Sequence, residues 1–433
     1  MRQATIQGVR IRWRIFSMLV AAAGVVYFQQ RAISVAAERI MPELSLSQMQ
    51  IGWLQWTFVL AYGLLQFPGG ILGQRMGGRR ALTALLLLAV AATVAAPLTP
   101  YAFHGTALFV ALLLTQFVLG VAHAPFMPVC AGLMEAWLPA GRWALAQGLH
   151  TFGMQVGAAL APPILVVLIE SMGWQPALIW AAFPPLILVA VWMWFGRDTP
   201  QEHPSVSVAE LEELAATPVA PPNHDISFGR IKRILANRSI AVATFSYVCM
   251  NYVFYLLSSW SFLYLIQERH FALLEGGLLA SLPPIGAAIG AATGGTLIDA
   301  LSLRIGVKWG FRIVPLIALP LAGVFLLVST FTDNPYVAVA ALTLAYGTVE
   351  VNEAAYWAGT MRIAQADSMA ATGVLNTGGN MGGWIGIPIV AYLSGDGHWT
   401  AAFVIGFFCA VVAAIGWLWV DTSQPLESVH VTA

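Results

Sequence analysis

Two glutamates lie three residues apart within a long apolar segment. Glu350 and Glu353 are followed one further turn along by Trp357, so one face of a helix would carry two carboxyl groups and an aromatic ring. Removal from water and a nearby like charge both oppose ionisation of the two carboxyls together. We therefore expect the pair to hold at least one proton near neutral pH and to exchange it reversibly. The structural alternative is a pair held by Arg31 or by neighbouring amides.

A lone arginine lies in the first apolar segment. Arg31 follows Tyr27 by one helical turn, so the two would share a face. The planar guanidinium fork matches a carboxylate, which predicts a binding site for an organic acid. The alternative is an arginine whose long side chain extends to water. Together with the two glutamates, Arg31 would also suit a zwitterion, with its carboxylate on the arginine and its amine on a glutamate.

A third ionisable group is His123, which follows Gln116 by seven residues and would share a helical face with it and with Gly120. Because histidine titrates near neutral pH, His123 could relay a proton. A neutral, hydrogen-bonded structural histidine fits the sequence equally well.

The composition indicates a membrane protein. Of 433 residues, 59% are hydrophobic and only 9% are charged, and the mean hydropathy is +0.76, whereas soluble domains are about a quarter charged. A net charge of +0 without a basic tail argues against a nucleic-acid partner. No metal-ligand cluster or nucleophile–base set is apparent, so neither an enzyme nor a cofactor is indicated.

The apolar runs predict an all-α membrane protein with twelve transmembrane helices, each about 20 residues long. They divide into two sets separated by a polar stretch. The expected parts are a cytoplasmic N-terminus at 1–14, a six-helix bundle at 15–196, a cytoplasmic central loop at 197–238, a second six-helix bundle at 239–420 and a cytoplasmic tail at 421–433. The expected spans are 15–37, 51–72, 81–98, 106–134, 147–170, 176–195, 239–266, 273–298, 312–331, 335–361, 371–394 and 400–420.

The distribution of positive charge predicts the orientation. With both termini in the cytoplasm, most of the 20 lysines and arginines fall on the cytoplasmic side, and only Arg39 and Arg269 lie outside. Cytoplasmic loops retain positive charge. An inner-membrane protein with both termini inside is therefore expected, which requires an even number of spans.

A weak internal repeat relates the two halves. The sequence GGIL at 69–72 leads to Arg79 and Arg80, and GGTLID at 294–299 leads to Arg304. The segment YGLLQFPGGILGQRMGGRR, from Tyr62 to Arg80, resembles the loop motif that follows the second helix in the major facilitator superfamily. Its Gln66 and Pro-Gly-Gly lead-in resemble the anion:cation symporter family, the organic-acid and sugar-acid carriers of the galactonate-carrier and sialin type.

This resemblance implies two pseudo-symmetric six-helix bundles around a central site. It also implies an anion-binding arginine at Arg31 and a loop that holds helix ends across the cytoplasmic gate, although its arginines equally satisfy the orientation rule. The expected substrate-binding residues are Tyr27, Gln30, Arg31, Tyr62, Gln116, Gln155, Tyr255, Trp357, Asn376 and Asn380. The expected proton-coupling residues are Glu350, Glu353 and His123, and the expected gating residues are Arg75, Arg79, Arg80, Asp299 and Arg304.

The chain departs from the family pattern at several of these positions. Gln30 replaces the acid beside the arginine, Gln116 and His123 replace an arginine and a glutamate, and Gln74 replaces the acid of the loop motif, while Asp299 retains the acid in the second half. These departures suggest that proton coupling has moved to the two glutamates of the second half.

We therefore expect proton-coupled uptake of a small organic anion by alternating access, with the substrate, protons and lipid as partners and a monomer as the working unit. The alternatives are a carrier of zwitterions, an exporter of hydrophobic compounds and, more remotely, a transporter-like sensor or a membrane-embedded enzyme.

Overall fold

The regular structure of the chain is helical throughout the part that the computed structural model describes, which is residues 10–215, 227–271, 279–395 and 397–426. The expected all-α class is therefore confirmed. Parts of the expected N-terminus, central loop, eighth span and tail lie outside these residues.

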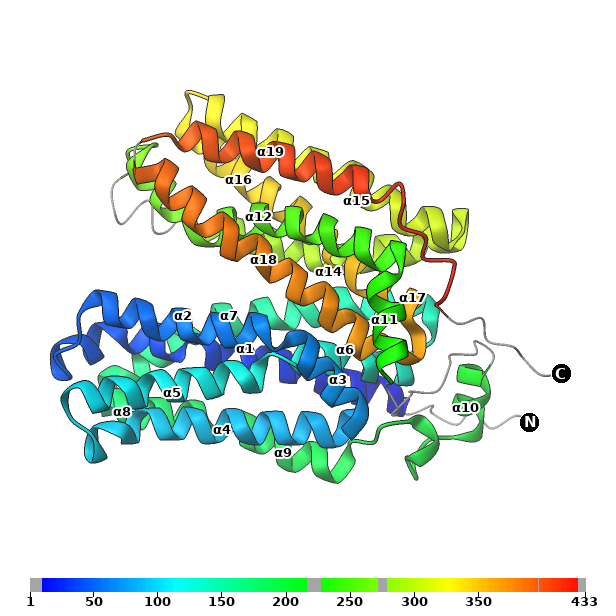
Figure 1. Cartoon of the computed structure of the whole chain (residues 1–433), viewed down its shortest axis with the longest axis horizontal. Coiled ribbons are helices and arrows are strands. Elements are labelled where there is room, and N and C mark those ends of the chain that lie inside the picture. Colours follow the sequence, from blue (N-terminus) through cyan, green and yellow to red (C-terminus); the bar gives the residue numbers. More distant parts are fainter. Residues whose placement is uncertain (1–9, 216–226, 272–278, 396, 427–433) are drawn as a thin grey trace, which may run out of the picture.

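The helices form two groups, seen as the blue-to-green and the green-to-red ribbons of Figure 1. The first bundle contains α1 (Ile11–Glu43), α2 (Gln48–Leu64), α3 (Gln66–Met76), α4 (Gly78–Ala102), α5 (Gly105–His123), α6 (Phe126–Trp137), α7 (Trp143–Met172), α8 (Trp174–Ala181) and α9 (Phe183–Phe195). The second contains α12 (Arg238–Gln267), α14 (Leu282–Ile305), α15 (Val307–Phe331), α16 (Pro335–Glu350), α17 (Glu353–Ala364), α18 (Ser368–Gly395) and α19 (Trp399–Gly416). Between them lie the short helices α10 (Val208–Ala215) and α11 (Phe228–Ala236).

Nine segments of the described chain are long and apolar enough to cross a membrane, or ten with the pair Met49–Leu64 and Gln66–Met76, which bends by 55°. Every expected span coincides at least in part with a helix or with two consecutive helices. The expected spans at 335–361 and 371–394 are not among the nine, and both carry polar residues. The number of twelve crossings therefore stays a prediction.

The sequence predicts one continuous helix for the tenth expected span. In the structure this span is broken, because α16 ends at Glu350 and α17 begins at Glu353. The Asn352 side-chain amide donates to the carbonyl oxygen of Thr348 at 2.6 Å. It thereby occupies a backbone acceptor next to the interruption, as required where no water is available. The two glutamates consequently stand on either side of a helix break rather than on one helical face.

The equivalent helix of the first bundle is interrupted as well. The α5 helix ends at His123 and α6 starts at Phe126, with Pro125 between them. Proline cannot donate a backbone hydrogen bond and disrupts the helix that precedes it. The two halves therefore share a broken helix at corresponding places.

Glycines form matching turns in the two halves. Gly77 joins α3 to α4 with φ of 82°, and Gly306 joins α14 to α15 with φ of 85°. This backbone region is unfavourable for residues with a Cβ atom, so both turns depend on glycine.

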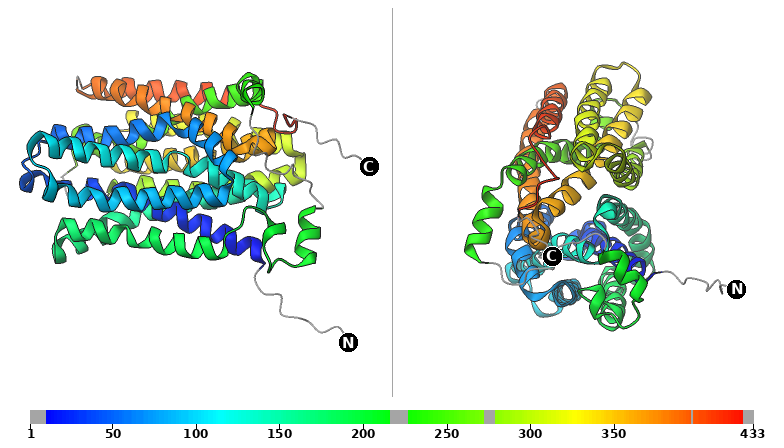
Figure 2. Two further views of the ribbon diagram at one scale, coloured as in Figure 1. Left: turned by 60° about the horizontal axis from the view of Figure 1, so that its bottom comes forward. Right: turned by 90° about the vertical axis from the view of Figure 1, so that its right-hand side faces the viewer.

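The two bundles converge at the end of the molecule where α3, α6, α11 and α17 lie, and their ribbons separate toward the opposite end (Figure 1). The view from the converging end shows helices of both bundles meeting there (Figure 2, right). The start of α1 is fixed at this end, because the Glu210 carboxylate in α10 accepts from the backbone N–H of Arg12 at 3.1 Å. The Arg12 guanidinium also donates to Glu213 and lowers the pKa of that carboxyl.

Helices α1 and α7 pack backbone to backbone at a pair of glycines. A Cβ atom added at Gly157 would overlap the backbone of Gly24, whereas one added at Gly52 would meet nothing. We predict that Gly157→Ala destabilises the protein by about 1–3 kcal/mol through overpacking, measured as a lower melting temperature in detergent. The matched replacement Gly52→Ala, on exposed helix surface, is expected to leave the melting temperature unchanged or raise it. An unaffected Gly157→Ala protein would contradict this packing.

Candidate functional site

A polar cavity of about 370 Å³ lies between the two bundles. Helices α1, α2, α6 and α7 line it from the first bundle, and α12, α16, α17 and α18 line it from the second. Its walls include eleven of the expected site residues: Tyr27, Gln30, Arg31, Tyr62, Gln155, Tyr255, Glu350, Glu353, Trp357, Asn376 and Asn380.

Arg31 presents an exposed guanidinium in this cavity. It makes no hydrogen bond or ion pair with any residue that the structure describes. Beside it on α1, the Tyr27 hydroxyl lies 3.5 Å from that of Tyr62 on α2. The donors of the arginine therefore remain available to a ligand, and two phenol groups lie nearby.

Glu353 is held by two donors from the second bundle. The Tyr247 hydroxyl donates to its Oε1 atom at 2.7 Å, and the Trp357 indole N–H donates to the same oxygen at 2.8 Å. Hydrogen bonds to a carboxylate favour its charged form. These two bonds stabilise an anion at Glu353 and fix its orientation.

Glu350 has a different environment. Its side chain is 2% exposed, and its Oε2 atom has no hydrogen-bond partner among the described residues. A buried carboxylate without partners is strongly disfavoured, whereas the neutral acid is tolerated. The break between α16 and α17 thus separates one carboxyl suited to carry a proton from another suited to carry a charge.

Amides complete the wall that α18 contributes. The Tyr255 hydroxyl donates to Asn380 Oδ1 at 3.0 Å, and Asn380 Nδ2 donates to the backbone oxygen of Asn376 at 2.8 Å. These contacts orient the Asn380 amide, and Asn376 lines the cavity beside it, so both amides are available to hydroxyl or carboxylate groups of a small molecule.

Two expected site residues lie away from the cavity. Gln116 and His123 are buried between α5 and α2, and the His123 ring packs edge-on against Phe58 with centroids 5.6 Å apart. Both ring nitrogens of His123 lack a partner among the described residues. The expected shared face exists, but it packs on α2 because Gly120 allows the α2 backbone to come close.

The cavity also contains residues that the sequence reading did not select. Tyr247 and Tyr346 are the most consequential, because Tyr247 bonds to Glu353 and Tyr346 lies one turn before Glu350. The sequence could have indicated Tyr247, because polar and aromatic residues recur at helical spacing along α12. The other unselected polar lining residues are Gln55, Thr151, Ser258 and Ser259.

At the converging end, each bundle holds a helix start of the other. The Asp299 carboxylate in α14 accepts from the backbone N–H of Leu145 in α7 at 3.0 Å. In the other half, Gln74 of α3 donates to Asp367 at 2.8 Å and accepts from the backbone N–H of Ala370 in α18. Acceptors at helix N-termini satisfy free N–H groups and complement the helix dipole.

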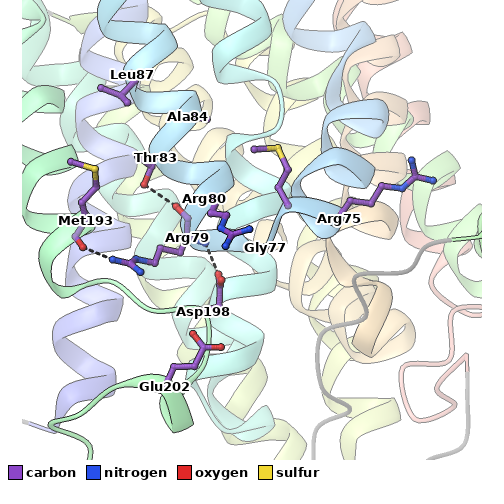
Figure 3. A pocket seen from close by; sticks show the side chains of 11 residues that line it. Arg75, Gly77, Arg79, Arg80, Thr83, Ala84, Leu87, Met193, Asp198 and Glu202 are labelled. Atoms are coloured by element: carbon purple, nitrogen blue, oxygen red, sulfur yellow. Dashed lines mark hydrogen bonds between the residues drawn. The ribbon is translucent and has the colours of Figure 1, made fainter.

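Arg79 makes different contacts from those of Asp299 and Gln74. Arg79 donates from Nη2 to the backbone oxygen of Met193 and from its backbone N–H to Asp198, both within the first bundle (Figure 3). Arg75 and Arg80 line the same pocket, and Arg304 is exposed at the end of α14. The structure thus brings Asp299 to the contact between the bundles, whereas Arg79 bonds to Met193 and Asp198 on its own side.

Comparison with known proteins agrees with this architecture. Residues 19–370 match the family model described as Major Facilitator Superfamily. The chain belongs to this superfamily. Like other major facilitator proteins it is a membrane transporter and not an enzyme.

Curated relatives confirm the resemblance to the anion:cation symporter type. The chain is 27% identical over 429 residues to a probable sulfoacetate transporter of Cupriavidus necator, covering 98% of this chain and 96% of the relative. It is 24% identical over 420 residues to a probable galactarate/D-glucarate transporter of Escherichia coli, covering 94% and 92%.

Solved structures share the fold of this transporter. The fucose:proton symporter of E. coli superposes with a TM-score of 0.70 at 18% identity, covering 95% of this chain and 100% of that one. A proton:xylose symporter superposes with a TM-score of 0.76 at 12% identity, covering 96% and 98%.

Proposed function

We propose that this major facilitator takes up a small organic anion together with protons. The observation that carries the proposal is the Arg31 guanidinium, exposed in the central cavity without a described partner, while the opposite bundle contributes Glu350 and Glu353. A carboxylate on Arg31 would form two parallel, charge-assisted hydrogen bonds.

The cavity supports a compact, polar substrate. A volume of about 370 Å³ is at the small end for ligand sites, and its tyrosine hydroxyls and amides can bond the hydroxyl groups of a sugar acid. The names of the relatives, which are probable carriers of sulfoacetate, galactarate and glucarate, support an organic anion. No cofactor is required for this function.

We assign the proton to Glu350 and a fixed charge to Glu353. A proton on Glu350 removes the cost of its unpaired oxygen, and Tyr247 and Trp357 favour an anion at Glu353. Protonation of Glu350 would offset the negative charge that the substrate anion brings to Arg31, so the loaded cavity would carry no more net charge than the empty one. Adding an uncompensated charge to a low-dielectric interior is costly, so substrate binding and protonation together would favour closure and turning of the bundles.

Alternating access would proceed by rocking of the bundles around this site. In the proposed topology, twelve spans cross the inner membrane, both termini are cytoplasmic and a single chain is the working unit. The converging end is then cytoplasmic, and the described conformation faces outward. Asp299 and Gln74 would hold the cytoplasmic gate closed.

We predict that Asp299→Ala shifts the protein toward the inward-facing state. A hydrogen bond to a charged group contributes about 2 kcal/mol, so its loss should change the ratio of the two states by roughly thirtyfold. Spin labels at Gly141→Cys and Leu303→Cys, on exposed positions of the two bundles, should report a longer distance at this end.

The control for the gate is Asp333→Ala, an exposed carboxylate between α15 and α16, which should leave the distance distribution unchanged. An unchanged distribution in Asp299→Ala as well would contradict the gating role of Asp299.

The direct test of the function is uptake into proteoliposomes containing the purified protein. Galactarate, glucarate, sulfoacetate and amino acids would be offered with an imposed proton gradient, with an imposed membrane potential and with neither. Saturable uptake of a carboxylate that accumulates only with an inward proton gradient is the expected result. Efflux of hydrophobic compounds without carboxylate uptake would overturn the proposal.

The second candidate is a carrier of zwitterions. The observation that favours it is the orientation of Glu353 by two donors, which prepares an anion for an ammonium group in the same cavity as Arg31. Uptake of amino acids, with no uptake of simple carboxylates, would select this candidate.

A further inference from the structure

Two hollows adjoin on the outer side of the first bundle, away from the central cavity. The polar pocket, with a volume of about 830 Å³, lies where α3 ends, α4 begins and the chain leaves α9. The apolar groove, with a volume of about 340 Å³, lies between α3 and α4. Both include Met76 and Ala84 in their walls, so the groove leads directly into the pocket.

The apolar groove has the dimensions and lining of a site for a hydrocarbon chain. Its walls carry exposed side chains such as Leu72 and Leu88, and the glycines Gly69 and Gly73, which have no side chains, also line it. The α3 wall runs from Leu65 to Met76, which is about 16 Å at 1.5 Å per residue. This length accommodates most of an extended acyl chain.

The polar pocket supplies positive charge at the end of the groove. Arg80 is exposed and makes no hydrogen bond or ion pair with the described residues, and the bond from Arg79 to the Met193 oxygen holds a second guanidinium beside it (Figure 3). Asp198 is engaged by the backbone N–H of Arg79. Arg75 and Glu202 also line the pocket, but the Arg75 side chain extends away from the other two arginines (Figure 3). Arg79 and Arg80 are therefore the adjacent guanidinium groups at the end of the groove.

We propose that the polar pocket and the apolar groove together bind one phospholipid. Its phosphate would lie at Arg79 and Arg80, and one acyl chain would occupy the groove between α3 and α4. Guanidinium groups bind phosphate oxygens through paired hydrogen bonds, and two adjacent guanidinium groups favour an anionic headgroup. The continuity with the groove favours a lipid over free phosphate, which needs no apolar channel.

Native mass spectrometry of the full-length protein, stripped of lipid in detergent, tests this site. The probes are phosphatidylglycerol, phosphatidylcholine and inorganic phosphate. We expect one phosphatidylglycerol to bind at least about tenfold more tightly than phosphatidylcholine, and Arg80→Ala to reduce that binding by about tenfold. The control Arg304→Ala removes an exposed arginine at the corresponding end of α14 and should not change it.

A second pair of variants tests the groove without changing charge. Ala84→Trp, or Leu72→Trp if the first does not fold, fills the groove and should abolish phosphatidylglycerol binding. Ile289→Trp, on the exposed surface of α14, should leave it intact. Binding of inorganic phosphate that survives Ala84→Trp, with lipid binding equal in all variants, would overturn the proposal in favour of a simple anion site. Equal binding of the two lipids with no effect of Arg80→Ala would also overturn it.

Discussion

Replacement of Arg31 by alanine is expected to weaken binding of the organic anion severely. The guanidinium lies in the central cavity and makes no bond to any described acid, so a bound carboxylate would be its main partner. Truncating one partner of a hydrogen-bonded charge pair costs about 2–5 kcal/mol. The dissociation constant should therefore rise by at least about thirtyfold, measured by isothermal titration with the best ligand from the uptake panel.

Arg31→Lys separates charge from geometry. It retains the positive charge but loses the planar fork, so we expect an intermediate loss of about tenfold. Arg39→Ala is the matched control, because it removes an exposed arginine from the same helix outside the cavity. Full affinity in Arg31→Ala, or equal losses in Arg31→Ala and Arg39→Ala, would contradict a carboxylate site at Arg31.

The fold and much of the cavity follow from the sequence because a bilayer penalises charge and requires helices. Few ionisable residues occur within the apolar segments, so Arg31, Glu350 and Glu353 stand out without any structure. All three line the cavity. The tight turns at Gly77 and Gly306 each follow one of the two Gly-Gly segments of the repeat seen in the sequence.

The sequence is less informative about the rotation of each helix. In a soluble protein an apolar stripe marks the buried face, but in a membrane the lipid face and the packed face are both apolar. Gln116 and His123 could therefore be placed on a common face, but not assigned to the cavity or to α2. The structure directs them to α2, where glycine permits a close helix crossing.

The spacing of the two glutamates in the sequence also does not predict the immediate environment of each carboxyl group. An i, i+3 pair on an unbroken helix implies two similar carboxyls, yet the break at Asn352 gives them unlike surroundings. The donor Tyr247 comes from a helix more than 100 residues earlier in the chain, and a tyrosine in an apolar segment is not by itself unusual. Only the packing of α12 against α17 distinguishes the proton-carrying group from the charged one.

Replacement of Glu350 by glutamine is expected to uncouple transport from the proton gradient. Glutamine has nearly the same shape as the protonated acid but cannot release a proton, so the site would remain permanently in its neutral form. Accumulation driven by an inward proton gradient in proteoliposomes should fall by at least about tenfold. Exchange of external for internal substrate, which requires no net proton movement, should remain within about twofold of the parent protein.

Glu353→Gln is expected to behave differently, because its carbonyl oxygen still accepts from Tyr247 and Trp357 while its charge is lost. Without that charge, the deprotonated state of Glu350 no longer faces a like charge, so proton release becomes easier and accumulation should be reduced with an altered pH dependence. The matched control is Glu170→Gln, which removes an exposed carboxyl near the end of α7 and should transport normally.

If Glu350→Gln and Glu353→Gln both accumulated substrate normally, the coupling proton would have to be carried by another group, and the assignment of these carboxyls would be wrong. Selective loss of accumulation in Glu350→Gln, with exchange preserved, would separate proton coupling from substrate recognition at Arg31.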